Sequence, residues 1–189
     1  MSENFALYGR ALDGFDRVIS SVPDDRWEAP SPCTEWKAVD VAGHVISVQL
    51  SVTGGLSGES LFGSGERPSL RDIAGPDPVA SWTSARAGLV EAASVEGALD
   101  TVLKTPFGEM PADTFLGILV LDALTHTWDL ARATGGDDKL DPELVSVCFE
   151  RIRPLDEAIR GGGFFGPARE APPGADEQTQ LMAFLGREV

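Results

Sequence analysis

The sequence predicts an all-α protein built as a helical bundle with extra short helices and long loops. Apolar residues recur at every third or fourth position along several long segments, which is the period of an amphipathic helix. Its 189 residues, 42% of them hydrophobic, are enough to bury one full core. We find neither an internal repeat nor a second core, and therefore expect a single domain spanning 1–189.

The N-terminal part contains two predicted helices separated by a loop. Apolar residues at threes and fours predict a helix over 4–21. Prolines and tryptophans mark 24–36 as a loop. The next helix is expected over 38–53, where β-branched residues weaken helix propensity so that packing must hold it. We expect the glycine pair 54–55 to end this helix.

The middle of the chain begins with a segment rich in Gly, Ser and Pro. Over 54–78 it has little periodicity, which predicts a long surface loop. Pro78 suits the first turn of a third helix over 79–93. Residues 101–104 fit a short strand and 106–111 a turn, so a short β-hairpin is compatible with this region.

A fourth helix and a C-terminal tail complete the prediction. The helix runs over 114–136, with Asp113 as its N-cap and the glycine pair 135–136 as its end. A fifth helix is expected over 141–160, where Pro154 predicts a kink or a break. The glycine run 161–163 then opens a tail, 161–189, which we expect to pack on the bundle through a short helix over 175–185.

The fourth helix carries the candidate functional residues. At 3.6 residues per turn, Asp122 and His126 fall on one face, among apolar residues. A buried carboxylate needs a compensating partner. The only other histidine, His44, lies in the second helix. We therefore predict a metal site at His44, Asp122 and His126; the alternative is a buried ion pair between Asp122 and His126.

Three neighbouring residue types are expected to have simpler roles. Asp129 either forms a structural pair with Arg132 on the helix surface, which we favour, or orients His126 from behind. The tryptophans are expected to pack between helices, although one of them could form a wall of the metal site. Cys33 precedes a helix start, where a thiol pKa can fall, whereas Cys148 is expected to be a core thiol.

Charge and composition exclude several classes of partner. The chain has 15 Lys and Arg against 30 Asp and Glu, a formal charge of −15, which repels nucleic acids and anionic membranes. No apolar run approaches the roughly 18 residues that span a bilayer, and the N-terminus lacks a secretory signal pattern. Two distant cysteines suggest neither a disulfide framework nor a thiolate zinc site. We expect a cytoplasmic monomer or homodimer.

Four stretches carry a resemblance to a known family: PSPCTEWKAVDVAGHVISVQL, LKTPFGEMPADTF, DALTHTWDLARATG and FGPAREAPPGADEQTQLMAFLGREV. Together they resemble actinobacterial metal-binding proteins of the DinB/YfiT-like superfamily that are related to mycothiol-dependent maleylpyruvate isomerase. The resemblance covers nearly the whole chain. It implies a DinB-like four-helix bundle whose metal is held by His44, Asp122 and His126. The isomerase has a glutamate where this chain has Asp122.

The resemblance also implies a chemistry. A metal site with three protein ligands keeps a position open, and a thiol bound there reacts as the thiolate. We therefore expect a mycothiol-dependent transferase or isomerase acting on a small electrophile, with zinc as the metal, or nickel next. Two alternatives stay open. One is a metal-dependent hydrolase, for which only Asp129 or Glu109 could serve as general base. The other is a non-catalytic bundle that binds a metal or a small molecule.

Overall fold

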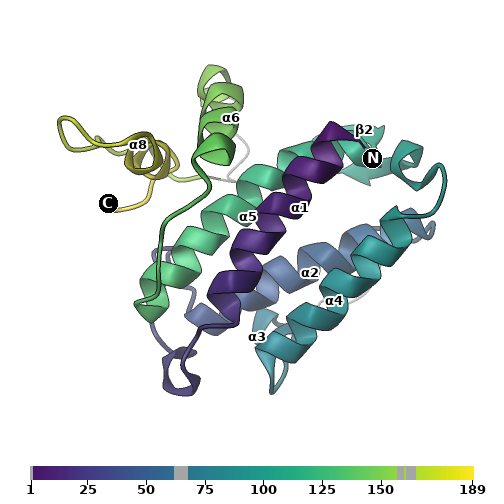
Figure 1. Cartoon of the computed structure of the whole chain (residues 1–189), viewed down its shortest axis with the longest axis horizontal. Coiled ribbons are helices and arrows are strands. Elements are labelled where there is room, and N and C mark those ends of the chain that lie inside the picture. Colours follow the sequence, from purple (N-terminus) through teal and green to yellow (C-terminus); the bar gives the residue numbers. More distant parts are fainter. Residues whose placement is uncertain (1, 62–67, 157–159, 161–164) are drawn as a thin grey trace.

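The computed structural model describes residues 2–61, 68–156, 160 and 165–189, and the chain is mostly helical, as predicted (Figure 1). The α-helices are α1 Glu3–Ile19, α2 Ala38–Leu56, α3 Leu70–Ala74, α4 Pro78–Ala93, α5 Ala112–Thr134, α6 Pro142–Ile152 and α8 Glu177–Phe184. Strands β1 Val102–Thr105 and β2 Gly108–Pro111 pair antiparallel. The 3₁₀ turns are η1 Asp24–Arg26, η2 Ala98–Asp100 and η3 Arg153–Leu155.

Four long helices, α1, α2, α4 and α5, form the bundle. Helix α1 packs along α5, while α2 packs against α3, α4 and α5 (Figure 1). Trp82 of α4 contacts α1, where the centroid of its indole ring lies 4.8 Å from that of the Phe15 ring. Its Nε1–H donates to the Asp16 carboxylate at 2.8 Å, so this aromatic side chain satisfies its one polar group at the edge of the core.

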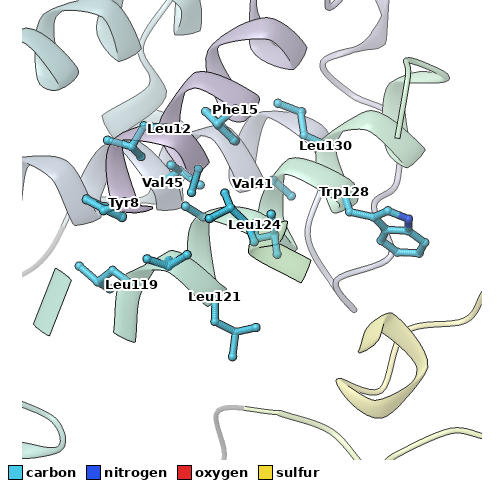
Figure 2. Packing of buried hydrophobic residues seen from close by; sticks show 14 of the residues in the cluster. Tyr8, Leu12, Phe15, Val41, Val45, Leu119, Leu121, Leu124, Trp128 and Leu130 are labelled. Carbon is cyan, nitrogen blue, oxygen red and sulfur yellow. The ribbon is translucent and has the colours of Figure 1, made fainter. Parts of the chain in front are cut away.

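The core lies between these helices. Figure 2 shows Leu12 and Phe15 of α1, Val41 and Val45 of α2, and Leu124 of α5 converging on one volume. All five side chains are buried. They recur at helical spacing, so that burying one stripe from each helix forms a continuous apolar interior. This packing fixes α2 and α5 side by side.

Helix α2 differs from the prediction at its C-terminal end. The glycine pair 54–55 does not terminate it, since the helix continues to Leu56. A Cβ at position 55 would approach side-chain atoms of Leu61 and Leu103 at 2.9 and 3.0 Å, so Gly55 serves close packing within the helix. Gly43 plays the same part at the other end, where α3 packs against α2: a Cβ there would lie 2.0 Å from the carbonyl oxygen of Leu70.

The predicted loop over 54–78 contains a helix that periodicity did not reveal. Helix α3 is only five residues long, and its start is fixed by Ser69 and Asp72, each side chain accepting from the backbone N–H of the other. Residues 62–67 of this segment lie outside the described residues. The short β-hairpin after α4 confirms the expected strand near 101–104, with Leu103 opposite Met110, but the turn predicted over 106–111 is shorter than expected, because residues 108–111 form the second strand.

Helix α5 begins earlier than predicted, and Asp113 is not its N-cap. The helix starts at Ala112 after Pro111, which places Asp113 in its first turn. The Asp113 carboxylate instead accepts hydrogen bonds from the side chains of Ser2 and Asn4, so that it ties α5 to the start of α1. At the other end Gly135 takes a left-handed conformation, φ 76°, and ends the helix as predicted.

The C-terminal part follows the prediction in outline. Helix α6 ends at Ile152 and is followed by the 3₁₀ turn η3, which contains Pro154. The predicted break at this proline is therefore confirmed. The glycine run 161–163 lies outside the described residues. Helix α8 packs against α6 and buries Leu181 and Met182. In the part of the chain that the structure describes, no helix has both the length and the apolar character needed to cross a membrane.

Candidate metal centre

The three predicted ligands come together between α2 and α5. His44 lies in the second turn of α2, and Asp122 and His126 lie one turn apart on α5. The His44 Nε2 is 3.1 Å from Asp122 Oδ1, and the His126 Nε2 is 3.6 Å from the same oxygen. One donor atom from each side chain lies within 4.8 Å of the other two. Two imidazoles and a carboxylate thus surround one point.

A hydrogen bond behind His126 determines which ring nitrogen faces this point. His126 Nδ1 lies 3.0 Å from Asp129 Oδ2, and because a carboxylate only accepts, Nδ1 carries the hydrogen. In the neutral ring, Nε2 is then an acceptor aimed at the Asp122 carboxylate, which is also an acceptor. Two facing acceptors repel each other unless a positive charge lies between them. A neutral His126 therefore suits a cation at this point, whereas a protonated His126 at the same 3.6 Å would form the ion pair that we considered as the alternative.

Burial and neighbouring groups shift the pKa values of His44 and Asp122 in opposite directions. Burial disfavours the charged form of His44, but the adjacent Asp122 carboxylate outweighs this effect and raises the pKa of His44. Burial also disfavours the charged Asp122, yet its interactions with the two imidazoles, that with His44 first, outweigh this effect and lower the pKa of Asp122. Asp122 is thus held as the carboxylate, the form that binds a metal.

Two of the three candidate ligands are partly exposed to solvent. The side chains of His44 and Asp122 are 25% and 29% exposed, whereas that of His126 is 9% exposed. The ring of Trp36, from the loop before α2, lies 5.1 Å from the His44 ring and 5.6 Å from the His126 ring. Trp36 therefore forms a wall of the site, one of the two roles considered for the tryptophans. A ligand can approach from the side of His44 and Asp122.

Asp129 does not form the surface pair that we favoured. Its side chain is fully buried, and Arg132 pairs with Asp138 instead, at 3.2 Å. Besides His126, the Asp129 carboxylate accepts from Arg187 Nε at 3.2 Å and from Arg187 Nη2 at 2.8 Å. Burial disfavours the charged Asp129, but the hydrogen bonds from His126 and Arg187 outweigh it and lower its pKa. The sequence analysis gave Arg187 no role at the site, although a buried carboxylate at 129 requires a cation.

The other residues considered for a chemical role are two unreactive cysteines and two carboxylates that are poorly placed to act as general bases. Burial raises the pKa of Cys33 and raises that of Cys148 to about 12, so neither thiol is activated, and both are free. Glu109 is exposed on β2, where it lies 3.9 Å from Lys104 across the hairpin. Asp129 is occupied by His126 and Arg187. Both general bases considered for a hydrolase are therefore poorly placed.

Comparison with known proteins places the chain among its relatives. Residues 8–131 match the family described as "Mycothiol maleylpyruvate isomerase N-terminal domain", a range that includes all three candidate ligands. Two proteins of Mycobacterium tuberculosis, named uncharacterized protein MT0763 (strain CDC 1551 / Oshkosh) and uncharacterized protein Rv0738 (strain ATCC 25618 / H37Rv), are each 35% identical over 190 residues. The alignment covers 95% of this chain and 95% of each relative. No solved structure matches the chain. The chain belongs to the mycothiol maleylpyruvate isomerase N-terminal domain family.

Proposed function

We propose that His44, Asp122 and His126 bind one divalent cation, with zinc preferred and nickel next. The observation that carries this proposal is the convergence of two imidazole nitrogens and one carboxylate oxygen within 4.8 Å of one another. Zinc bonds to such atoms are about 2.0–2.2 Å long, so donors this close can share an ion after small side-chain movements. Nickel accepts the same ligand types, so residue chemistry does not separate the two metals, and the preference for zinc comes from the family resemblance.

The geometry supports a reactive site over a purely structural one. Structural zinc sites are commonly closed by four protein ligands, whereas catalytic sites use three and leave a position for a ligand. Only three candidate ligands meet here among the described residues, and two of them are partly exposed. An incoming group can therefore reach the cation from the side of His44 and Asp122.

We infer that the incoming group is a thiol and that the protein is a thiol-dependent transferase or isomerase. A bound divalent cation lowers the pKa of a thiol that joins it, so that the thiol is held as the nucleophilic thiolate. The family description supports mycothiol as this thiol, with a small electrophile as the second substrate.

The residues around the ligands have definite parts in this proposal. Asp129 fixes the His126 ring so that Nε2 faces the cation. Trp36 covers both imidazole rings and limits access from its side. A hydrolase would need a carboxylate free to accept a proton from water beside the cation. Asp129 is hydrogen-bonded on both oxygens, which favours thiol transfer over hydrolysis.

Metal binding is tested first, on protein purified without an affinity tag. Elemental analysis should find close to one equivalent of zinc or nickel, and His126→Ala should lose most of it because one of three ligands is removed. Apo-protein titrated with Zn²⁺ and with Ni²⁺ against a chromogenic chelator then ranks the two metals. Wild-type protein that competes for neither metal would contradict the proposal.

Activity is tested with the metal-loaded protein, mycothiol and a chromogenic electrophile. We expect a rate above that of the metal-free protein, and loss of that acceleration in Asp122→Asn. Other thiols should react more slowly than mycothiol if the site recognises the whole cofactor. A metal-loaded protein that accelerates no thiol reaction is a non-catalytic metal-binding bundle, and the transferase assignment is then wrong.

A further inference from the structure

Among the described residues, Arg187 is the one buried Arg or Lys, and from outside the four-helix bundle it reaches Asp129, which lies behind the candidate ligand His126. Its guanidinium contacts both oxygens of Asp129, through Nε at 3.2 Å and Nη2 at 2.8 Å. Arg187 is 8% exposed and Asp129 is fully buried, so water does not screen this pair. Two parallel N–H donors on one carboxylate fix both its position and its plane.

The oxygen that Arg187 holds is also the oxygen that holds His126. Asp129 Oδ2 accepts from Arg187 Nη2 and from His126 Nδ1, at 2.8 and 3.0 Å. His126 therefore depends on Asp129 for the orientation of its ring, and Asp129 depends on Arg187 for its own. The chain of contacts runs from the C-terminal segment to a candidate metal ligand in two hydrogen-bonded steps.

Backbone hydrogen bonds and apolar packing hold the C-terminal segment that carries Arg187. Helix α8 ends at Phe184, and Gly186 turns the chain with a left-handed φ of 86°. The backbone N–H of Arg187 donates to the Met182 carbonyl at 2.9 Å, and its Nη1 donates to the Leu185 carbonyl at 3.1 Å. The side chains of Met182 and Leu185 are buried, so apolar packing anchors the segment that presents the guanidinium.

We propose that Arg187 is a positioning residue of the metal site and that docking of the C-terminal segment 181–187 is coupled to metal binding. The proposal rests on the proposed function, because it needs a cation at His126. Coupling between two binding events is reciprocal, so the cation stabilises the docked segment as much as the docked segment strengthens cation binding. The inference covers a segment that lies beyond the family match, which ends at residue 131.

The test compares Arg187→Gln with Arg169→Gln in the full chain. Arg169 also holds the C-terminal segment, donating from Nε to the Gly186 carbonyl at 3.0 Å, and no contact joins it to Asp129 among the described residues. Removing a residue that orients a metal-binding histidine weakens metal affinity by about 10–100-fold. We expect a loss of this size in the Zn²⁺ affinity of Arg187→Gln, and a change of less than about twofold in Arg169→Gln.

Two further measurements separate positioning from a general loss of stability. Cobalt substituted for zinc should give a visible absorption spectrum that changes in Arg187→Gln and not in Arg169→Gln, because the spectrum depends on ligand geometry. Hydrogen exchange at the amides of Leu185 and Arg187 should slow when Zn²⁺ binds to wild-type protein and stay unchanged in Arg187→Gln. If Arg187→Gln does not fold, Arg187→Lys is measured instead, since lysine keeps the charge without the two-pronged contact.

The failures of the two proposals are distinguishable. Wild-type protein that binds neither Zn²⁺ nor Ni²⁺ overturns the proposed function itself. Wild-type protein that binds Zn²⁺ while Arg187→Gln binds it equally well overturns only the role of Arg187. Equal weakening in Arg187→Gln and Arg169→Gln also overturns that role, because it would reflect looser docking of the segment without a specific effect through Asp129.

Discussion

Gly43 provides a sharp test of how the second helix is held beside the candidate metal site. It precedes His44 directly, and it faces the backbone of α3 so closely that a Cβ at position 43 would lie 2.0 Å from the Leu70 carbonyl oxygen and 2.6 Å from its carbonyl carbon. The obstacle is backbone, so a side-chain rotation cannot relieve it. In Gly43→Ala, α3 must withdraw by more than about 1 Å to reach ordinary contact distance.

The expected cost follows from this clash. Overpacking of a close contact costs about 1–3 kcal/mol, partly offset by the higher helix propensity of alanine, which contributes about 0.5–1 kcal/mol. Gly9→Ala is the matched control, because Gly9 lies inside α1 and a Cβ there would meet nothing within 4 Å. That change should stabilise the protein by about 0.5–1 kcal/mol. The two substitutions are chemically identical and differ only in their surroundings.

Urea denaturation followed by circular dichroism measures both variants. We expect the midpoint to fall in Gly43→Ala and to rise in Gly9→Ala with slopes close to that of the wild type. Gly43→Ala should also weaken Zn²⁺ binding, since Leu70 of α3 lies against Gly43, the residue before His44. A Gly43→Ala protein as stable as Gly9→Ala would refute the close approach of α3 to α2.

Three further predictions concern the metal, the α1–α4 contact and acid stability. A chelator should lower the melting temperature of the wild type and leave that of Asp122→Asn unchanged, because a ligand at about 100 times its Kd stabilises by about 2.7 kcal/mol. Trp82→Phe should lose about 1–3 kcal/mol in urea denaturation, because it removes the hydrogen bond to Asp16 and leaves a void; an unchanged midpoint would contradict this. Hydrogen bonds from Arg71, the larger effect, and from Lys37 lower the pKa of Glu28 to about 2. The ionised Glu28 therefore stabilises the folded protein at pH values above the ordinary pKa of a glutamate, and this stabilisation is lost as the pH falls toward 2. The difference in unfolding free energy between wild type and Glu28→Gln should therefore shrink between pH 5 and pH 2, as urea titrations at each pH will show.

Periodicity was sufficient for the long helices because their apolar residues recur at helical spacing, although α5 is buried on nearly all sides between Leu119 and Thr134. The segments around Phe15, Val45 and Leu124 were assigned correctly for this reason, and so was the placement of Asp122 and His126 one turn apart. The structure also brings the donor atoms of His44 and this pair within 4.8 Å of one another. Their proximity could be expected because a buried carboxylate needs a partner and the chain has only two histidines to offer. Metal binding by the three stays a prediction.

Two of the errors, those at the end of α2 and at the start of α5, have a common physical origin in contacts with other segments of the chain. The glycines at 54 and 55 look like a helix end in isolation, but packing against Leu61 and Leu103 makes Gly55 favourable inside the helix. Asp113 has the right chemistry for an N-cap, yet Ser2 and Asn4 engage it from another helix. Local rules cannot include a partner more than a hundred residues away.

Asp129 shows the same principle at the site itself. Its sequence neighbour Arg132 offers an i,i+3 pair, which is the local solution, whereas the structure uses Arg187 from the far end of the chain. The signal that could have identified this pairing was the burial of position 129, which follows from its place between Trp128 and Leu130 on a helix surrounded by other elements. A carboxylate there excludes an exposed partner and requires a buried cation.

The rigidity of the site is distributed unevenly, and this bears on how it would work. His126 is held on one side by Asp129, which Arg187 fixes in turn, and on the other by the Trp36 ring. His44 and Asp122 are partly exposed, and one 3.1 Å contact between His44 Nε2 and Asp122 Oδ1 joins them. A cation would thus find one ligand already oriented and two that can adjust as it enters. The adjustable side is also the open side, so a thiol approaching there would meet the cation where the protein can best accommodate a change in coordination. Selectivity among substrates is therefore expected to depend on residues next to His44 and Asp122. Changes around Asp129 should instead alter the affinity for the metal, and so affect all substrates alike.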